Sequence, residues 1–244
     1  MQAQRPSSFF IGLSMDSSSP GKLEATAEQV TPFSWVPWLT AACGSFLIFV
    51  ILTWLIRVDE RVSNFDLSCA GIMQEHAGNN EAIRNFFWLM TCLGGTVGLA
   101  LLASAGTLTM FLRKEYLLAA IWVLATAGGA LVNLSVKYTV HRERPKPNTR
   151  DPFVEHFHNP SYPSGHAMGS AIGLGICLFA VLRFLKRQRG KILTAAALIL
   201  LILLIGFSRV YLRAHWLTDV LGGFALGTSW LIFCLAIHER LRRY

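Results

Sequence analysis

A histidine and an aspartate four residues apart lie in a short polar segment near the end of the chain. His215 and Asp219 belong to the segment Ser208–Asp219, which separates two long apolar runs and also carries Arg209. In a helix, residues four apart share one face, so the carboxylate can fix the imidazole tautomer and make the ring more basic. This pair suits a general base or a nucleophile. A simpler interpretation also stands, in which the arginine reaches lipid headgroups and Asp219 caps the next helix.

Two further polar clusters precede this segment. Lys137 and Arg144 are two helical turns apart at the end of an apolar run, where they would lie along one helix face until Pro145 ends the helix. Two side chains that could bind phosphate are therefore present. A belt of cations that only reaches lipid headgroups at a helix end would show the same sequence pattern.

The second cluster, Pro163–His166, opens the next apolar run. A helix N-terminus attracts anions through its free N–H groups, and Gly165 would let the backbone approach a ligand closely. Ser164 can donate a hydrogen bond or cap the helix, and His166 could give a proton to a leaving oxygen. A plain Pro-Ser cap with an incidental histidine is the alternative.

Together these groups suit phosphoryl transfer without a metal or cofactor. Cations and N–H groups would hold phosphate oxygens, one histidine would attack phosphorus, and the other would protonate the departing oxygen. No histidine pair or carboxylate cluster has metal-ligand spacing in this sequence.

Six apolar runs must position these residues, and each approaches the roughly 20 residues needed to cross a bilayer. They predict an all-α, polytopic membrane domain over residues 33–244, after a mobile cytoplasmic tail at 1–32. The predicted spans are Trp35–Ile56, Phe86–Leu112, Tyr116–Val136, Ala167–Leu185, Ile192–Phe207 and Leu217–Ile237. Glycines in several of these runs would permit close helix packing in lipid.

The composition agrees with a membrane protein and not with a nucleic-acid-binding one. Of 244 residues, 53% are hydrophobic and 15% charged, and the net charge of +8 comes largely from residues flanking apolar runs. More than half of the lysines and arginines fall in the tail, the second and fourth connections and the C-terminus. Both termini should therefore be cytoplasmic, with the three polar clusters facing the periplasm or cell exterior.

The connection between the first two spans, Arg57–Asn85, is polar with short apolar pieces. We expect short helices around Phe65–Met73 and Ala82–Phe87 that lie on the outer face, in what is otherwise a simple connector. Its acidic and histidine side chains, Asp66, Glu75 and His76, are expected to be structural.

The three clusters read KxxxxxxRP, PSGH and SRxxxxxHxxxD, and in this order they resemble the signature of the type 2 phosphatidic acid phosphatase superfamily. The resemblance covers roughly Phe86 to Ile237, and the six-span layout is similar to the bacterial phosphatidylglycerophosphate phosphatase B group. It implies that His215 is the nucleophile, Asp219 its orienting carboxylate and His166 the acid and then the base. It also implies phosphate-binding residues, namely Lys137, Arg144, Ser164, Gly165 and Arg209.

Other polar residues near the clusters have no fixed role in that superfamily. We expect contacts to the site residues or to a lipid headgroup, or no role at all, for His141, Arg142, His156, His158 and Arg213.

The leading hypothesis is an integral-membrane lipid phosphatase in the bacterial inner membrane. Its substrate would be phosphatidylglycerophosphate, phosphatidic acid or undecaprenyl diphosphate, and no protein partner is evident. A phosphotransferase of the same superfamily differs only in the acceptor, and a lipid transporter or scramblase is a further alternative from another class. We also expect a lateral groove near the starts of the fourth and sixth spans, flanked by Tyr162, Tyr211 and Trp216.

Overall fold

The computed structural model describes residues 34–77, 80–145 and 159–243, and the compact unit comprises Phe33–Tyr244. The predicted tail at 1–32 lies outside the described residues. The described part is helical, which confirms the all-α prediction. Its helices are α1 (Val36–Val58), α2 (Glu60–Ala77), α3 (Glu81–Gly94), α4 (Thr96–Leu112), α5 (Tyr116–Val140), α6 (Gly165–Phe184), α7 (Gln188–Tyr211) and α8 (Leu217–Leu241).

The number of candidate membrane spans agrees with the sequence when the bent helix pair counts as one span. Helices α1, α5, α6, α7 and α8 are each long and apolar enough to cross a membrane, and α3 and α4 together form a sixth candidate bent by 50°. The second predicted span, Phe86–Leu112, is not one continuous helix. Gly95 takes an extended conformation (φ −73°, ψ 169°) between α3 and α4. Adjacent glycines at 94 and 95 explain the break, because glycine is a poor helix former.

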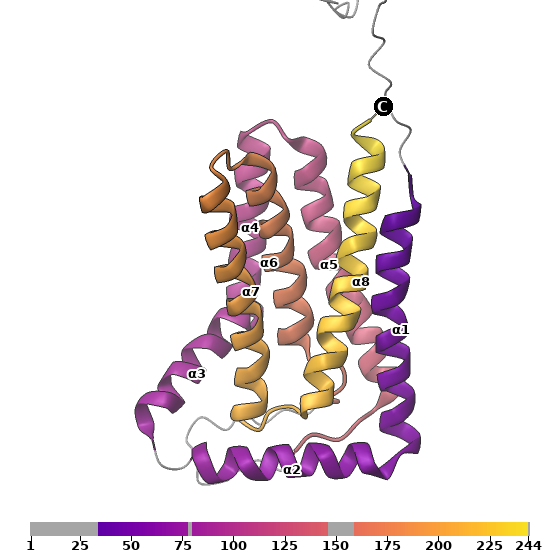
Figure 1. Cartoon of the computed structure of the whole chain (residues 1–244), viewed down its shortest axis with the longest axis vertical. Coiled ribbons are helices and arrows are strands. Elements are labelled where there is room, and N and C mark those ends of the chain that lie inside the picture. The colour runs from indigo at the N-terminus through magenta and orange to yellow at the C-terminus, as the bar shows by residue number, and fades with distance from the viewer. Residues whose placement is uncertain (1–33, 78–79, 146–158, 244) are drawn as a thin grey trace, which may run out of the picture. The chain divides into compact units, whose positions relative to one another are not determined.

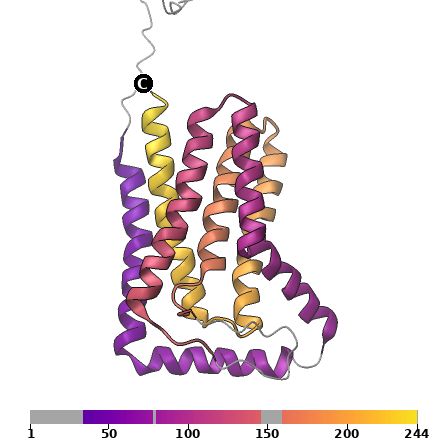
Figure 2. The same ribbon diagram turned by 180° about the vertical axis from the view of Figure 1, so that it is seen from behind.

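Helix α8 is a central element of the bundle. It packs against α1 and α6, and α6 packs in turn against α5 and α7. Figures 1 and 2 show α2 crossing one end of the bundle, with α3 leaning outward beside it. The beginning of α1 and the end of α8 lie together at the opposite end.

Close contact between α6 and α8 depends on small residues, as the glycine pattern predicted. A Cβ atom on Gly223 would lie 2.7 Å from the carbonyl oxygen of Ser164, and one on Gly227 would lie 2.8 Å from that of Met168. Backbone atoms cannot move aside easily, so a side chain at either position would push the helices apart. These glycines hold the start of α8 beside the start of α6, where two of the polar clusters lie.

The connection between the first two spans is more ordered than a simple connector. Residues Glu60–Ala77 form one 18-residue helix, and Ala82–Phe87 belongs to the start of α3. Asn80 caps α3 by accepting a hydrogen bond from Ile83 N at 3.2 Å. Helix α2 therefore forms a separate layer across the end of the bundle that carries the polar clusters (Figure 1).

Candidate active site

The three polar clusters meet at one end of the bundle. The first cluster lies at the end of α5 and just after it: the helix ends at Val140, so the expected helix face shared by Lys137 and Arg144 up to Pro145 is wrong, and Arg144 lies in the following segment. The second cluster lies at the beginning of α6, and the third runs from the end of α7 to the first turn of α8. Backbone hydrogen bonds connect them, from Ser161 N to Arg142 O at 2.8 Å and from Ser164 N to Asp219 O at 3.0 Å. Residues far apart in sequence therefore surround a common space.

His215 lies between a carboxylate and a guanidinium group. Its Nδ1 is 3.3 Å from Asp219 Oδ2, and its Nε2 is 3.2 Å from Arg144 Nη1. Asp219 Oδ2 also accepts a hydrogen bond from Trp216 N at 3.0 Å. The carboxylate thus caps α8 and faces the imidazole, so both interpretations of this residue describe the structure. With the Nδ1 proton directed at Asp219, the Nε2 lone pair faces the Arg144 donor, and it becomes available to a ligand when that donor turns to the ligand's oxygens.

The surroundings of His215 favour the neutral imidazole. Burial holds the pKa of His215 well below its usual value, and the positive charges of Arg209, Arg144 and Lys137 lower this pKa further. A neutral ring has the free electron pair that a nucleophile requires.

Arg144 is positioned by carbonyl and amide oxygens around it. Its Nη1 donates to Ala214 O and its Nη2 to Asn159 Oδ1, each at 2.7 Å, while Nε donates to Asn159 O at 2.9 Å. These contacts hold a planar group of N–H donors beside Nε2 of His215. Such a group matches the geometry of phosphate oxygens.

Two more cations border the same space. Arg209 near the end of α7 is 1% exposed and donates a hydrogen bond from Nη1 to Thr91 Oγ1 on α3. Lys137 near the end of α5 is 5% exposed, and its Nζ donates to Pro160 O at 2.6 Å. Buried cations close together repel one another, and an anionic ligand would relieve that repulsion.

The beginning of α6 contributes backbone and a second histidine. Ser164 is fully buried as the N-cap, and its hydroxyl accepts from Ala167 N at 3.5 Å, so it holds the helix start and does not line the cavity. Gly165 and His166 do line the cavity. Gly95 at the α3–α4 break is close by, since a Cβ atom there would lie 3.6 Å from His166 Nε2.

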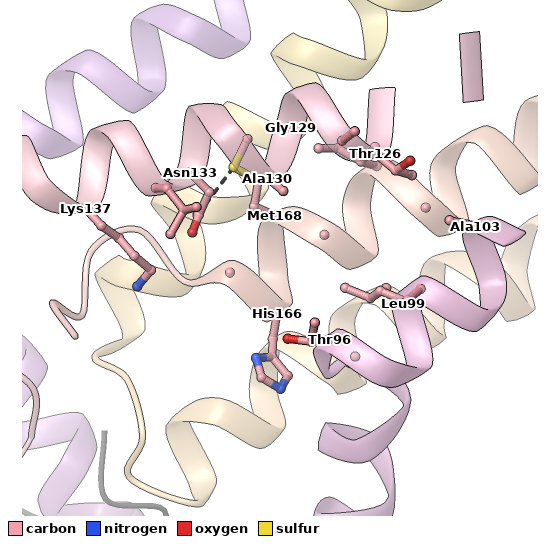
Figure 3. Close-up of a pocket in the computed structure, with 18 of the residues that line it drawn as sticks. Thr96, Leu99, Ala103, Thr126, Gly129, Ala130, Asn133, Lys137, His166 and Met168 are labelled. Atoms are coloured by element: carbon pink, nitrogen blue, oxygen red, sulfur yellow. Dashed lines mark hydrogen bonds between the residues drawn. The ribbon is translucent and has the colours of Figure 1, made fainter. Parts of the chain in front are cut away.

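A cavity of about 560 Å³ connects these polar groups to the membrane-spanning part of the bundle. Lys137, Arg144, Arg209, His166 and His215 border one end of it. The remainder runs between α4, α5 and α6, and Figure 3 shows its lining continuing from Lys137 and His166 past Leu99 and Met168 to Ala103 and Thr126. We call this remainder the interhelical groove, and small or apolar side chains dominate its lining, including Leu99, Ala103, Ala130, Gly169 and Gly173.

The expected position of the groove is correct for the fourth span and wrong for the sixth. The groove adjoins the start of the fourth span, α6, but no residue of α8 lines it. Tyr162 and Tyr211 are buried, and Tyr162 stacks on Phe49 with ring centroids 5.8 Å apart. Trp216 donates its indole N–H to Glu143 O at 2.9 Å. Helix α8 packs mainly against α1 and α6, and the groove is lined by α4, α5 and α6.

The residues without a fixed role separate into different environments. Arg142 contacts Asp219, with Nη1 to Oδ1 at 2.6 Å, whereas His141 is exposed and its ring contacts the carbonyl of Tyr138. Arg213 is partly buried with φ 55°, outside the cavity lining. His156 and His158 lie outside the described residues, as do the side chains of Glu75 and His76.

Two polar residues near the site were not expected from the sequence to serve it. Thr91 on α3 accepts from Arg209, and Asp66 on α2 is buried beside Arg142. Both lie upstream of the three motifs. A lone aspartate at a helical position facing inward was a weak signal, and Thr91 within an apolar run carried none.

Comparison with known proteins places this geometry in a family. Residues 116–243, more than half of the chain, match the PAP2 superfamily. The chain belongs to the PAP2 superfamily. This stretch contains all three clusters that meet at the cavity, and the match confirms the resemblance of the motifs.

Relatives in the PAP2 superfamily include membrane phosphatases of similar length. Phosphatidylglycerophosphatase B of Bacillus subtilis (strain 168) is 29% identical over 204 residues, which is 82% of this chain and 95% of that protein. The crystal structure of the transmembrane PAP2-type phosphatidylglycerolphosphate phosphatase from Bacillus subtilis superposes with a TM-score of 0.72 at 28% identity. That match covers 84% of this chain and 98% of the other.

A second solved structure is similar in fold alone. Aquifex aeolicus LpxE has a TM-score of 0.52 at 24% identity, with 69% of this chain and 93% of that chain covered. Taken together with its spans and its superfamily, the chain is a multi-pass membrane phosphatase of the PAP2 type.

Proposed function

We propose that this PAP2 protein hydrolyses the phosphate monoester or diphosphate of a membrane lipid through a phosphohistidine intermediate. The observation that carries the proposal is the placement of His215. Its Nε2 lies 3.2 Å from a guanidinium nitrogen of Arg144, and the ring borders the same cavity as His166 and the interhelical groove.

In the first step, Nε2 of His215 attacks phosphorus and an N–P bond forms while the bond from phosphorus to the leaving oxygen breaks. His166 donates its proton to that oxygen. Lys137, Arg144 and Arg209, with the N–H groups at the start of α6, stabilise the charge on the phosphate oxygens. Asp219 holds the Nδ1 proton of His215 and stabilises the positive ring that forms.

In the second step, water hydrolyses the phosphohistidine. The now neutral His166 takes a proton from water, the oxygen attacks phosphorus, and the N–P bond breaks. Inorganic phosphate leaves, and both histidines return to their starting states. A phosphotransferase would use the same residues with a lipid or sugar hydroxyl in place of water.

The interhelical groove supports a lipid substrate. Its lining between α4, α5 and α6 is small and apolar below the cations, so an acyl or prenyl chain can stay among the spans while the phosphate reaches His215. Candidate substrates are phosphatidylglycerophosphate, which the names of the relatives also suggest, phosphatidic acid and undecaprenyl diphosphate.

The test of the nucleophile is His215→Asn in the purified protein, with His141→Asn as a matched control. His141 is exposed and has φ 53°, a backbone conformation that asparagine adopts readily. We expect the His215 variant to stay folded and lose phosphate release from all three lipids, while the control keeps wild-type activity. Brief incubation of the wild type with labelled substrate should trap an acid-labile phosphoenzyme. Substantial turnover by a folded His215→Asn protein would refute the mechanism.

A second measurement concerns metal dependence. Fixed cations already surround His215, and the described residues contain no group of three or more histidine, cysteine, aspartate or glutamate side chains placed to hold a metal ion. We expect phosphate release to persist in excess EDTA and to be inhibited by vanadate, which resembles five-coordinate phosphorus. Loss of activity in EDTA that Mg²⁺ restores would contradict this expectation.

A further inference from the structure

Among the described side chains of α2, Asp66 is a buried carboxylate in an otherwise exposed stretch. Asp66 is 2% exposed, whereas its neighbours Phe65 and Leu67 are 52% and 57% exposed. A buried carboxylate is expensive unless it is paired and hydrogen-bonded. The contacts that satisfy Asp66 therefore show what holds this surface helix to the bundle.

Both oxygens of Asp66 are directed at residues next to the active site. Oδ1 accepts a hydrogen bond from Thr218 N, in the first turn of α8, at 3.1 Å. Oδ2 accepts from Arg142 Nη2 at 2.7 Å and from the hydroxyl of Thr218. Thr218 is itself 4% exposed, so these bonds form away from water.

Arg142 carries the connection to the catalytic pair. Its second terminal nitrogen, Nη1, donates to Asp219 Oδ1 at 2.6 Å and to Thr218 Oγ1 at 2.7 Å. The other oxygen of Asp219 is the one that faces Nδ1 of His215, at 3.3 Å. One guanidinium plane thus bridges two buried carboxylates, and the series runs from Asp66 through Arg142 and Asp219 to His215.

The geometry points to Asp66 as a positioning residue for the catalytic histidine. It fixes the plane of the Arg142 guanidinium and the first turn of α8, so that the Asp219 carboxylate stays directed at Nδ1 of His215. Groups behind the directly acting residues commonly set the orientation and basicity of an imidazole. The inference rests on the proposed function of His215, and it makes α2, which lies outside the residues matched to the superfamily, part of the catalytic machinery.

The alternative is that Asp66 only anchors α2. An anchor would affect folding and stability, whereas a positioning residue acts on the chemical step through Asp219. The two roles differ in the split between kcat and KM, in rescue by glutamate, and in the effect of Asp66 substitution when Asp219 is already changed.

The experiment compares Asp66→Asn and Asp66→Glu with Glu60→Gln, an exposed acid of the same helix. The substrate is phosphatidylglycerophosphate in detergent micelles. We expect Asp66→Asn to lower kcat by about 10-fold to 100-fold, the range typical of groups that orient a ligating or reacting residue. KM should stay within about twofold, Asp66→Glu should restore part of kcat, and Glu60→Gln should match the wild type.

The double variant Asp66→Asn/Asp219→Asn separates the two roles most directly. If Asp66 acts through Asp219, the double variant should be no slower than Asp219→Asn by more than about twofold. The inference would be overturned if the kcat losses of the two single variants multiply in the double variant. It would also be overturned if Asp66→Asn keeps the wild-type kcat. Should Asp66→Asn fail to fold, Thr218→Val and Thr218→Ser take its place, and only the valine, which lacks the hydroxyl bonded to Asp66, should lower kcat.

A readout without turnover keeps this inference distinct from the proposed function. If the wild type releases no phosphate from any of the three candidate lipids, the proposed function fails, and amide hydrogen exchange decides the role of Asp66. Asp66→Asn should then speed exchange in residues 216–220, because an amide NH2 in place of one carboxylate oxygen cannot accept from Arg142 and the Thr218 hydroxyl, which loosens the contact to Thr218 N, and Glu60→Gln should not. Unchanged exchange in Asp66→Asn would overturn the positioning role.

Discussion

At the residue scale, the central feature is a neutral histidine among cations. His215 is 3% exposed and directs Nδ1 at Asp219, while Arg144 lies at Nε2. Burial and the neighbouring positive charges lower its pKa, and a lower pKa keeps the ring unprotonated as the solution becomes more acidic. As the proposed nucleophile, His215 would therefore be ready at neutral pH without a separate base.

This environment predicts the acid limb of the pH profile. Protonated His215 cannot attack, so kcat/KM should fall only below the usual histidine pKa of about 6.5. Arg144→Gln removes a charge that lowers this pKa, so the limb should move to higher pH, and the plateau should fall by roughly 10²-fold to 10³-fold with the lost phosphate contact. Profiles measured on one substrate from pH 4 to 8 make the comparison.

Arg213→Gln is the control for that measurement, because Arg213 is outside the cavity lining and is not among the charges that lower the pKa of His215. Its acid limb should coincide with that of the wild type. An Arg144→Gln profile that keeps the wild-type limb would show that another group controls it.

At the element scale, the break between α3 and α4 shapes the cavity. The two halves meet at 50°, so Thr91 on α3 reaches Arg209 while α4 turns along the interhelical groove. One straight helix could not both place Thr91 beside Arg209 and line the interhelical groove, because the two positions do not lie along a single axis. A broken span that lines a cavity is a tolerated exception to continuous helices in lipid.

The groove predicts selectivity for long chains. Ala103 on α4 lines the part of the groove away from Lys137 (Figure 3), and Ala103→Phe should fill space that a lipid chain uses. We expect kcat/KM for long-chain phosphatidic acid to fall at least about 10-fold, since displaced apolar contact lowers binding. Hydrolysis of a water-soluble short-chain phosphate should change little.

The matched control is Ala105→Phe, two residues away on the same helix but exposed and outside the lining. This variant should treat both substrates as the wild type does. Equal losses on long and short substrates in Ala103→Phe would mean that the groove does not select the chain.

At the scale of the whole bundle, the candidate site lies at one end and the larger share of the basic connecting segments lies at the other. The cavity cations and α2 occupy one end, while the beginning of α1 and the end of α8 share the other (Figure 1). Basic residues of the second and fourth connections and of the C-terminus accumulate at that other end. This distribution predicts that the active-site end faces the periplasm or cell exterior.

Cysteine labelling tests this orientation. Ser63→Cys on α2 and Gln188→Cys at the start of α7 introduce exposed thiols at the two ends of the bundle, with the wild type and its native cysteines as background. In intact spheroplasts, an impermeant maleimide should label Ser63→Cys above background and should label Gln188→Cys only after lysis. The reverse pattern would invert the topology.

The sequence alone determined which residues the site could use and how many candidate membrane spans the chain has. The number of candidate spans follows from apolar length. His215 and Asp219 do meet, as their spacing suggested, but not on a shared helix face: His215 lies before α8, and Asp219 in the first turn faces it while capping that helix. The order of three short motifs was enough to indicate the superfamily, because motif residues are close in sequence within each cluster.

Only the tertiary structure decided which remote residues support the site. Asp66 and Thr91 lie 76 and 118 residues from the arginines they contact, and no local periodicity marks such pairs. The sequence also could not show which helices line the groove. This depends on contacts between distant segments, namely α1 covering α8, and on the bend between α3 and α4 at Gly95. Apolar length predicts that a helix crosses a membrane, but packing determines which of its faces remains open.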